Sequence, residues 1–436
     1  MADKNAWVII VGAGPAGLLL ALMLGKKGVP VQVVEKADNI DTRPRATHYA
    51  APAVRTLHRA GVLEDARKRG FTPNKISWRK LDLTYLGGIS QKVFPEDDKE
   101  LMVCLPLDRL GKLILEYLEP LSNVQIKYNH EVINIGQDDC SAWVDVHSPA
   151  GKQTLRARYV VGCDGASSKV RSCLFGDSFP GFTWEEQIVA TNTYFHFDKY
   201  GFDDANFILH PQHWYMAARI SKYGLWRVTY GEEKGLTNEE LIARQPSKFE
   251  KFLPGNPKPE EGQYQVESIS PYRVHQRLAE RMRVGRILLA ADAAHLCNPF
   301  GGMGLTGGIA DIDGLYDCLI GIYEQKTDGS ILDKYDEVRR AVYNDIINPV
   351  SSANIRRLFA LDPDTASDTD EFLKACRRAE TDPDFSREFQ RGINAIVHDF
   401  TQYYQLPGSA SQQPEVGTPS KLDRVKVEEV AGGITD

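Results

Sequence analysis

The sequence predicts an α/β fold in which a domain built on a buried parallel sheet is interleaved with a mostly antiparallel sheet domain, with helices at the C-terminal end. An apolar run at residues 8–11 is followed by a glycine-rich turn and a second apolar run at 31–34, which is the strand, helix, strand order of a parallel sheet. Residues 182–283 hold strand-like segments separated by Gly, Asp and Pro turns, which is typical of an antiparallel sheet. Apolar residues at helical spacing return at Ile309, and helical patterns continue to about Tyr404.

Between these landmarks the other elements follow in order. A helix is expected at about 53–60, a strand excursion out of the first domain at 76–94, and a helix that returns to it at 108–118. Two apolar runs, 124–128 and 142–146, are predicted to form a small antiparallel flap.

The turn after the first strand has the spacing of a dinucleotide-binding turn. Gly12 permits the tight turn, Gly14 lets a pyrophosphate approach the backbone, and Gly17 lets the following helix pack closely. The helix presents its free N–H groups to the phosphates. Glu35 ends the second strand, where a carboxylate can accept a ribose hydroxyl. The chain is therefore predicted to bind an adenine dinucleotide.

Two further motifs also follow predicted strands. Asp164 and Asp292 each stand where a buried strand ends, and an acid in that place can bind a cofactor hydroxyl. The segment 299–308 is rich in glycine, which lets backbone N–H groups and a helix N-terminus face an anionic ligand atom. His295, shortly after Asp292, is expected to brace this loop from outside the catalytic pocket.

These motifs together resemble those of the class A FAD-dependent aromatic hydroxylases, the flavoprotein monooxygenases of the p-hydroxybenzoate hydroxylase type. The resemblance implies a Rossmann-like FAD-binding domain interleaved with a mostly antiparallel β-sheet substrate domain, plus C-terminal helices. The expected boundaries are 1–75, 101–181 and 284–405 for the FAD-binding domain with its C-terminal helices, 76–100 and 182–283 for the substrate domain, and 406–436 for a disordered tail.

By this resemblance FAD binds tightly and without a covalent bond. Glu35 holds the adenosine ribose, Asp292 holds the ribityl chain, and Asp164 serves the architecture of the FAD site or the docking of NADPH. Arg171 and Lys169 are read either as attractants for NADPH phosphates or as a solvated helix face. The predicted cofactor-binding residues are Gly12, Gly14, Pro15, Ala16, Gly17, Glu35, Lys36, Arg45, Arg109, Asp164, Gly165, Asp292, Pro299, Gly301, Gly302, Met303, Gly304 and Leu305.

The chemistry that the resemblance implies has two halves. NADPH or NADH reduces FAD, and the reduced flavin then reacts with O2 at C4a to give a hydroperoxide in a pocket that excludes water. We therefore expect a monooxygenase that inserts one oxygen atom into a small aromatic, phenolic or polycyclic secondary-metabolite substrate. Hydroxylation, oxidative decarboxylation and epoxidation stay open, because one hydroperoxide serves all three. The alternatives are an FAD-dependent reductase or dehydrogenase that does not activate oxygen, and a non-catalytic FAD-binding protein.

The substrate base or anchor is sought among polar and aromatic residues behind the Arg45 loop and on the antiparallel sheet. The predicted catalytic residues are His48, Tyr49, Tyr194, His196, Tyr215, Arg219 and Trp226, with His213 and Arg227 as further candidates. Taken alone, a His or Tyr on a half-buried strand is more often a packing residue than a substrate contact.

Length and composition limit the remaining possibilities. The chain has 436 residues, a formal net charge of −7 and no basic stripe, so its electrostatics offer nothing to nucleic acid. The apolar run 18–24 is too short to span a bilayer. The 7 cysteines include no C-x-x-C pair, and Cys297 is expected to serve packing. We expect a cytoplasmic monomer or homodimer without metal, nucleic-acid partner or membrane association.

Overall fold

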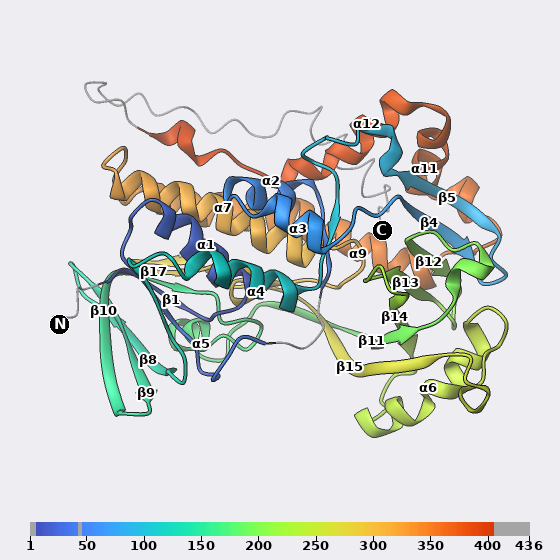
Figure 1. The fold of residues 1–436 in the computed structure, drawn as a ribbon, viewed down its shortest axis with the longest axis horizontal. Helices are drawn as coiled ribbons and strands as arrows, with labels where there is room; N and C mark the ends of the chain where they lie inside the picture. Colours follow the sequence, from blue (N-terminus) through green and yellow to red (C-terminus); the bar gives the residue numbers. More distant parts are fainter. Residues whose placement is uncertain (1–5, 42–45, 405–436) are drawn as a thin grey trace.

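The computed structural model describes residues 6–41 and 46–404. Within these residues lie two eight-stranded sheets and one two-stranded sheet, and helices pack against both large sheets (Figure 1). The predicted α/β fold class is therefore confirmed. Arg45 and the tail 406–436 lie outside the described residues, and the domain boundaries stay a prediction.

The first large sheet is parallel at its centre. Its main strand order is β16-β17-β10-β1-β2-β7, and β9 and β8 extend it from β10. Strands β17, β10, β1, β2 and β7 run parallel to one another. The strands are β1 (Ala6–Val11), β2 (Val31–Val34), β7 (Val124–Lys127), β8 (Glu131–Gln137), β9 (Ala142–Ser148), β10 (Gly151–Gly162), β16 (Arg283–Val284) and β17 (Ile287–Leu289).

Burial on both faces explains why the central strands are apolar throughout. Val8, Ile9 and Ile10 of β1 are 0% exposed, as expected for a parallel strand covered on both sides. Three helices, α1 (Pro15–Lys26), α4 (Leu107–Leu118) and α7 (Met303–Tyr323), lie together along this sheet (Figure 1).

The predicted flap is correct only in part. Residues 124–127 form β7, which pairs in parallel with β2 as the edge of the main sheet, so they do not join the flap. The flap instead consists of β8 and β9, which pair antiparallel, together with the first half of β10. An edge strand is half exposed, and its mixture of apolar and polar residues therefore looks like that of a flap strand.

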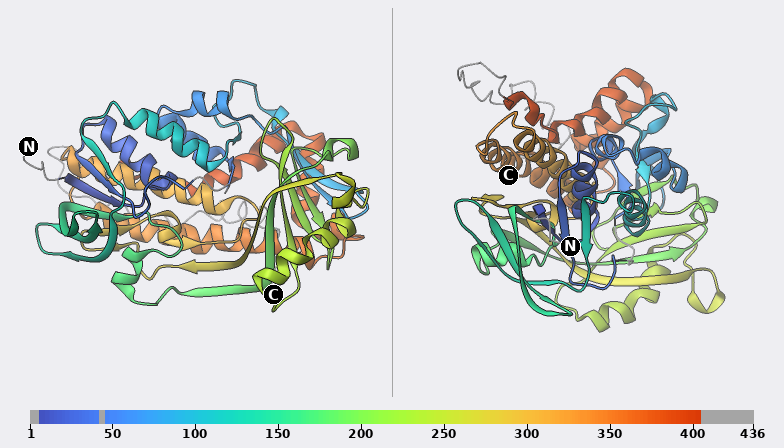
Figure 2. Two further views of the ribbon diagram at one scale, coloured as in Figure 1. Left: turned by 60° about the horizontal axis from the view of Figure 1, so that its bottom comes forward. Right: turned by 60° about the vertical axis from the view of Figure 1, so that its left-hand side comes forward.

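The second large sheet has the order β18-β15-β11-β14-β13-β12-β4-β5. All its pairs are antiparallel except β12 with β4. Helix α6 covers one face (Figure 2), and α9 and α11 contribute to the core on the other. The elements are β4 (Lys75–Lys80), β5 (Tyr85–Ser90), β11 (Gly181–Tyr194), β12 (Ala205–Leu209), β13 (Tyr215–Arg219), β14 (Leu225–Glu232), β15 (Gln265–Leu278), β18 (His295–Leu296), α6 (Asn238–Phe252), α9 (Asn348–Phe359) and α11 (Glu371–Thr381).

Two features join the halves of the molecule. The 14-residue strands β11 and β15 run from the side of the first sheet into the second. In addition, β18, which follows β17 of the first sheet in the chain, pairs with β15 of the second sheet.

No helix in the described part of the chain is long and apolar enough to cross a membrane. The remaining elements include β3 (His48–Tyr49), β6 (Val103–Cys104), α2 (Ala51–Arg59), α3 (Leu63–Arg69), α5 (Lys169–Phe175), α8 (Ile331–Val342), the π-helix η5 (Tyr343–Ile347), α10 (Ala366–Thr369) and α12 (Pro383–Arg391).

Candidate active site

The glycine turn lies at the carboxyl end of β1. Gly12 has a φ of +106°, and a Cβ on Gly17 would lie 2.1 Å from the carbonyl oxygen of Gly12, so neither position accepts a side chain. A Cβ on Gly14 would meet no atom within 4 Å. The turn therefore leaves open space over Gly14, where α1 begins and its N–H groups are free for an anion.

Glu35 reaches this turn from the end of β2. Its carboxylate accepts a hydrogen bond from the backbone N–H of Ala13 at 2.8 Å and another from that of Ala37 at 3.0 Å. These contacts fix the carboxylate beside the mouth of the glycine turn.

The Asp164 loop touches the glycine turn. Strand β10 pairs with β1, and a Cβ on Gly12 would lie 2.5 Å from the carbonyl oxygen of Cys163. Oδ2 of Asp164 accepts from the N–H groups of Lys169 at 2.7 Å and Val170 at 3.1 Å. Asp164 therefore caps α5 with its own carboxylate, and burial raises the pKa of that carboxyl above its usual range.

The third loop lies beside the second because β17 pairs with β10. Asp292 follows β17 on the short helix η4 (Ala291–Ala293) and is exposed. Gly301 and Gly302 have φ values of +105° and +67°, and α7 begins immediately afterwards at Met303. The carboxyl ends of β1, β10 and β17 thus bring all three predicted motifs to one edge of the parallel sheet.

The position of Arg171 contradicts the expectation that it could belong to a solvated helix face. It is 8% exposed, and its guanidinium donates to the carbonyl oxygens of Ala293 at 2.9 Å and Ala166 at 2.7 Å. The residue is therefore no part of a solvated helix face, because it ties the second loop to the third. Lys169 is exposed.

A polar cluster lies on the face of the second sheet opposite to α6. Arg227 on β14 donates from Nε to Oδ1 of its cross-strand neighbour Asn192 at 2.8 Å. Burial, aided by the charge of Arg227, lowers the pKa of His48 to about 4. Nε2 of His48 and Nδ2 of Asn192 are buried and have no hydrogen-bond partner among the described residues. This set of atoms can receive a polar ligand.

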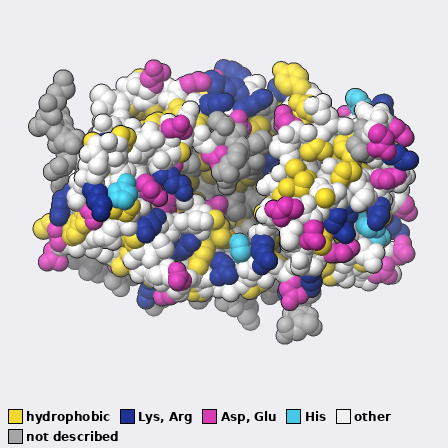
Figure 3. All heavy atoms as spheres, turned by 90° about the horizontal axis from the view of Figure 1, so that it is seen from below, with side chains coloured by type: hydrophobic (Ala, Val, Ile, Leu, Met, Phe, Trp, Pro, Cys, Tyr) yellow, Lys and Arg dark blue, Asp and Glu magenta, His cyan; other side chains and the backbone are white. Residues whose placement is uncertain are grey.

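Tyr272 on β15 lies near this cluster. Its side chain is 36% exposed, yet loss of hydration raises its pKa, against the opposing effect of Arg227. Figure 3 shows one face of the molecule, on which the surface is hollowed between two lobes.

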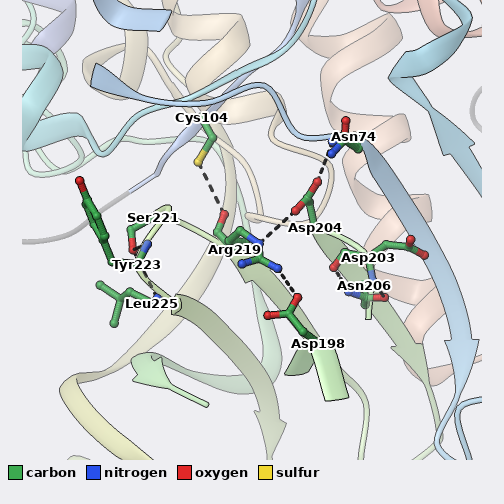
Figure 4. A network of polar contacts seen from close by, with 10 residues as sticks. All are labelled: Asn74, Cys104, Asp198, Asp203, Asp204, Asn206, Arg219, Ser221, Tyr223 and Leu225. Atoms are coloured by element: carbon green, nitrogen blue, oxygen red, sulfur yellow. Dashed lines mark hydrogen bonds and ion pairs between the residues drawn. The ribbon is translucent and has the colours of Figure 1, made fainter. Parts of the chain in front are cut away.

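Other predicted substrate residues lie elsewhere. Tyr215 and Trp226 are 0% exposed and belong to the core that α6 covers. Arg219 pairs with Asp198 and Asp204, and its carbonyl oxygen accepts from Sγ of Cys104 (Figure 4). These contacts explain all three residues by packing or ion pairing.

The remaining predicted residues differ in exposure. Tyr194 and His196 are exposed near the end of β11, and Tyr49 is buried with no hydrogen-bond partner for its hydroxyl among the described residues. His213 stacks on His210 at 5.0 Å between ring centroids. Of the other predicted cofactor residues, Lys36 and Arg109 are exposed, Met303 is buried, and the rest are intermediate: Pro15, Ala16, Gly165, Pro299, Gly304 and Leu305.

Comparison with known proteins identifies the family. The family model described as "FAD binding domain" matches residues 5–349. Para-nitrophenol 4-monooxygenase of Pseudomonas sp. (strain WBC-3) is 38% identical over 383 residues, which cover 88% of this chain and 94% of the relative. The chain belongs to the FAD binding domain family. The resemblance to class A FAD-dependent aromatic hydroxylases is thereby confirmed, and the family member is an FAD-dependent monooxygenase of that type.

Two further similarities support this membership. The 6-hydroxy-3-succinoylpyridine 3-monooxygenase HspB of Pseudomonas putida is 36% identical and covers 82% of this chain and 90% of the relative. The crystal structure of p-nitrophenol 4-monooxygenase PnpA from Pseudomonas putida DLL-E4 matches with a TM-score of 0.84 and 37% identity, over 90% of this chain and 98% of that chain. A complex of aklavinone-11 hydroxylase, at 22% identity and a TM-score of 0.71, shares the fold.

The residues of this family member fit FAD. A Cβ on Gly14, Gly165 or Gly302 would meet nothing within 4 Å, so the backbone of all three loops is open to a ligand. Burial raises the pKa of Cys297 to about 12, so its thiol stays protonated beside the third loop.

The sequence did not predict Asn192 and Tyr272 as site residues, because a lone Asn or Tyr on a strand belongs to no recognisable motif.

Proposed function

We propose that this monooxygenase acts on a phenol or hydroxypyridine with an electron-withdrawing substituent para to the hydroxyl, and delivers oxygen to the carbon that bears this substituent. The similarity to two named relatives carries the proposal. The name of each relative gives the ring position at which it acts as a monooxygenase. In both substrates this carbon lies para to the hydroxyl and bears a substituent, which is nitro in one case and succinoyl in the other.

The polar cluster supports this substrate class. Because its pKa is about 4, His48 is neutral at pH 7 and can accept the hydroxyl proton at Nε2. Arg227 then supplies positive charge beside the anion that forms. An electron-withdrawing para substituent makes the hydroxyl more acidic, and the positive charge of Arg227 lowers the pKa of the bound hydroxyl further, so that proton transfer to a weak base becomes less unfavourable.

The three loops would hold FAD, which supplies the reduction of O2. Glu35 accepts the ribose hydroxyls, the N–H groups over Gly14 bind the pyrophosphate, and Asp292 binds the ribityl chain. The glycine loop before Met303 presents backbone N–H groups to the flavin ring. We propose NADPH or NADH as the electron donor.

The test uses the purified holoenzyme with 4-nitrophenol, and with 4-nitroanisole as a matched compound that has no hydroxyl. We expect NAD(P)H oxidation, O2 uptake and nitrite release with 4-nitrophenol alone, since attack at the nitro-bearing carbon expels that group. Comparing NADPH with NADH identifies the donor. Oxidation of NAD(P)H with no substrate-stimulated O2 uptake contradicts the proposal and favours a reductase.

A further inference from the structure

The segment that carries Asp292 is held by a buried set of charged side chains. Asp311 on α7 is 0% exposed. One carboxylate oxygen accepts from Nε of Arg339 at 2.6 Å, and the other lies 2.7 Å from Nε2 of His295. Arg339 also donates to the carbonyl oxygens of Ile396 at 2.6 Å and Gly307 at 3.3 Å. The carboxylate thus binds His295 and Arg339 directly, and Arg339 links it to the backbone at Ile396 and Gly307.

Charge fixes the direction of these hydrogen bonds. Burial opposes ionisation of Asp311, but the charges and hydrogen bonds of His295 and Arg339 lower its pKa below the usual range. An ionised carboxylate only accepts hydrogen bonds, so Nε2 of His295 carries the proton. His295 therefore acts as a donor toward α7, as the bracing role predicted for it requires.

The same carboxylate holds a strained backbone position. Ala291, immediately before Asp292, has a φ of +55°, which is unfavourable for a residue with a Cβ. Its N–H donates to Oδ2 of Asp311 at 2.9 Å. Gly308 of α7 makes room for this turn, because a Cβ there would lie 2.8 Å from the Cβ of Ala291.

A second contact secures the segment beyond His295. The hydroxyl of Tyr343 donates to the carbonyl oxygen of Leu296 at 2.8 Å, and its ring lies 5.3 Å from that of His295. Tyr343 opens the π-helix η5, and such turns often occur at functional sites. Strand β18 therefore makes hydrogen bonds to α7 through His295 and to η5 through Leu296.

We infer that Asp311 is a positioning residue of the FAD site, whose carboxylate fixes the strained Ala291 turn and thereby directs Asp292 toward the ribityl chain. The inference rests on the proposed role of Asp292. Asp311 is fully buried, so we expect it to act on cofactor retention through the Ala291 turn.

Asp311→Asn tests the inference, with Asp370→Asn as the matched control. Asp370 is also a buried, ion-paired carboxylate, 3.0 Å from Nε of Arg357. It caps α11, and within the described part of the chain it forms no hydrogen bond or ion pair with the Ala291 turn. Apoprotein is titrated with FAD while flavin fluorescence is followed, and apoprotein Tm is measured. We expect both variants to lower Tm, and Asp311→Asn alone to raise the Kd for FAD by about tenfold, equivalent to about 1.4 kcal/mol. A wild-type Kd in Asp311→Asn, or an equal rise in Asp370→Asn, overturns the inference.

A second pair of variants keeps the Asp311–Arg339 ion pair and so protects folding. In His295→Gln the amide N–H can still donate to Asp311, whereas in His295→Leu it cannot. We expect the Gln variant to retain most of the FAD affinity and the Leu variant to lose it; equal Kd values contradict the inference. Asp292→Ala separates the two proposals, because an unchanged Kd there refutes the role of Asp292 itself.

Discussion

The charge of Arg227 on β14 lowers the pKa of His48 on β3, although the two residues belong to different sheets. Burial is the larger cause of the lowered pKa of His48 and the charge of Arg227 the smaller, and together they bring it to about 4. The imidazole is therefore an uncharged acceptor at pH 7, with a cation nearby to stabilise an anion.

Replacing His48 by Gln tests this role. We expect kcat/KM for 4-nitrophenol to fall by about 10²–10⁴-fold below the pKa of the phenol, the range typical of a lost general base. Above that pKa the phenol arrives already ionised, so the deficit should shrink. Steady-state kinetics across the pH range measure it, with the exposed His147→Gln as control. A deficit that is constant with pH means that His48 orients the substrate without taking its proton.

The same shift predicts how stability depends on pH. The pKa of His48 falls from 6.5 to about 4 on folding, so between these values the unfolded chain binds a proton that the folded chain does not. Stability from this group is full above pH 6.5 and is lost as the pH falls toward 4. The loss is at most about 3 kcal/mol. Thermal unfolding at pH values within and above this window should show a smaller drop in Tm for His48→Gln than for wild type. Equal drops contradict the shift.

Glu35→Gln probes the first loop. An amide cannot accept at both of its positions, so one of the hydrogen bonds from Ala13 and Ala37 or a ribose contact must be lost. We expect the Kd for FAD to rise by about tenfold, since a hydrogen bond to a charged group contributes about 1.5–3 kcal/mol. Fluorescence titration measures the Kd, with the exposed Glu116→Gln as control. An unchanged Kd with a lower apoprotein Tm would assign Glu35 to bracing the turn alone.

The three loops could be predicted from sequence because each is encoded in a short run. Gly17 stands where a Cβ cannot fit, and Glu35 stands at a strand end, so the local pattern carries the geometry. The substrate face could not be predicted in this way. Alternation places the neighbours Trp226 and Arg227 on opposite faces, but only the packing of α6 decides which face is covered. Likewise, no short sequence pattern predicts the contact between His295 and Asp311.

Substitutions of Tyr215 and Tyr272 test which face of the second sheet binds the substrate. The hydroxyl of Tyr215 is buried with no hydrogen-bond partner among the described residues, and its ring packs 4.7 Å from that of Phe252 on α6. Removing an unsatisfied buried hydroxyl relieves a cost of about 1–3 kcal/mol, so Tyr215→Phe should raise Tm and leave KM unchanged. Tyr272 is 36% exposed beside Arg227, so Tyr272→Phe should raise KM by about threefold or more through a lost hydrogen bond of about 0.5–1.5 kcal/mol, with little change in Tm. The opposite pattern of KM would mean that the substrate lies on the α6 side of the sheet.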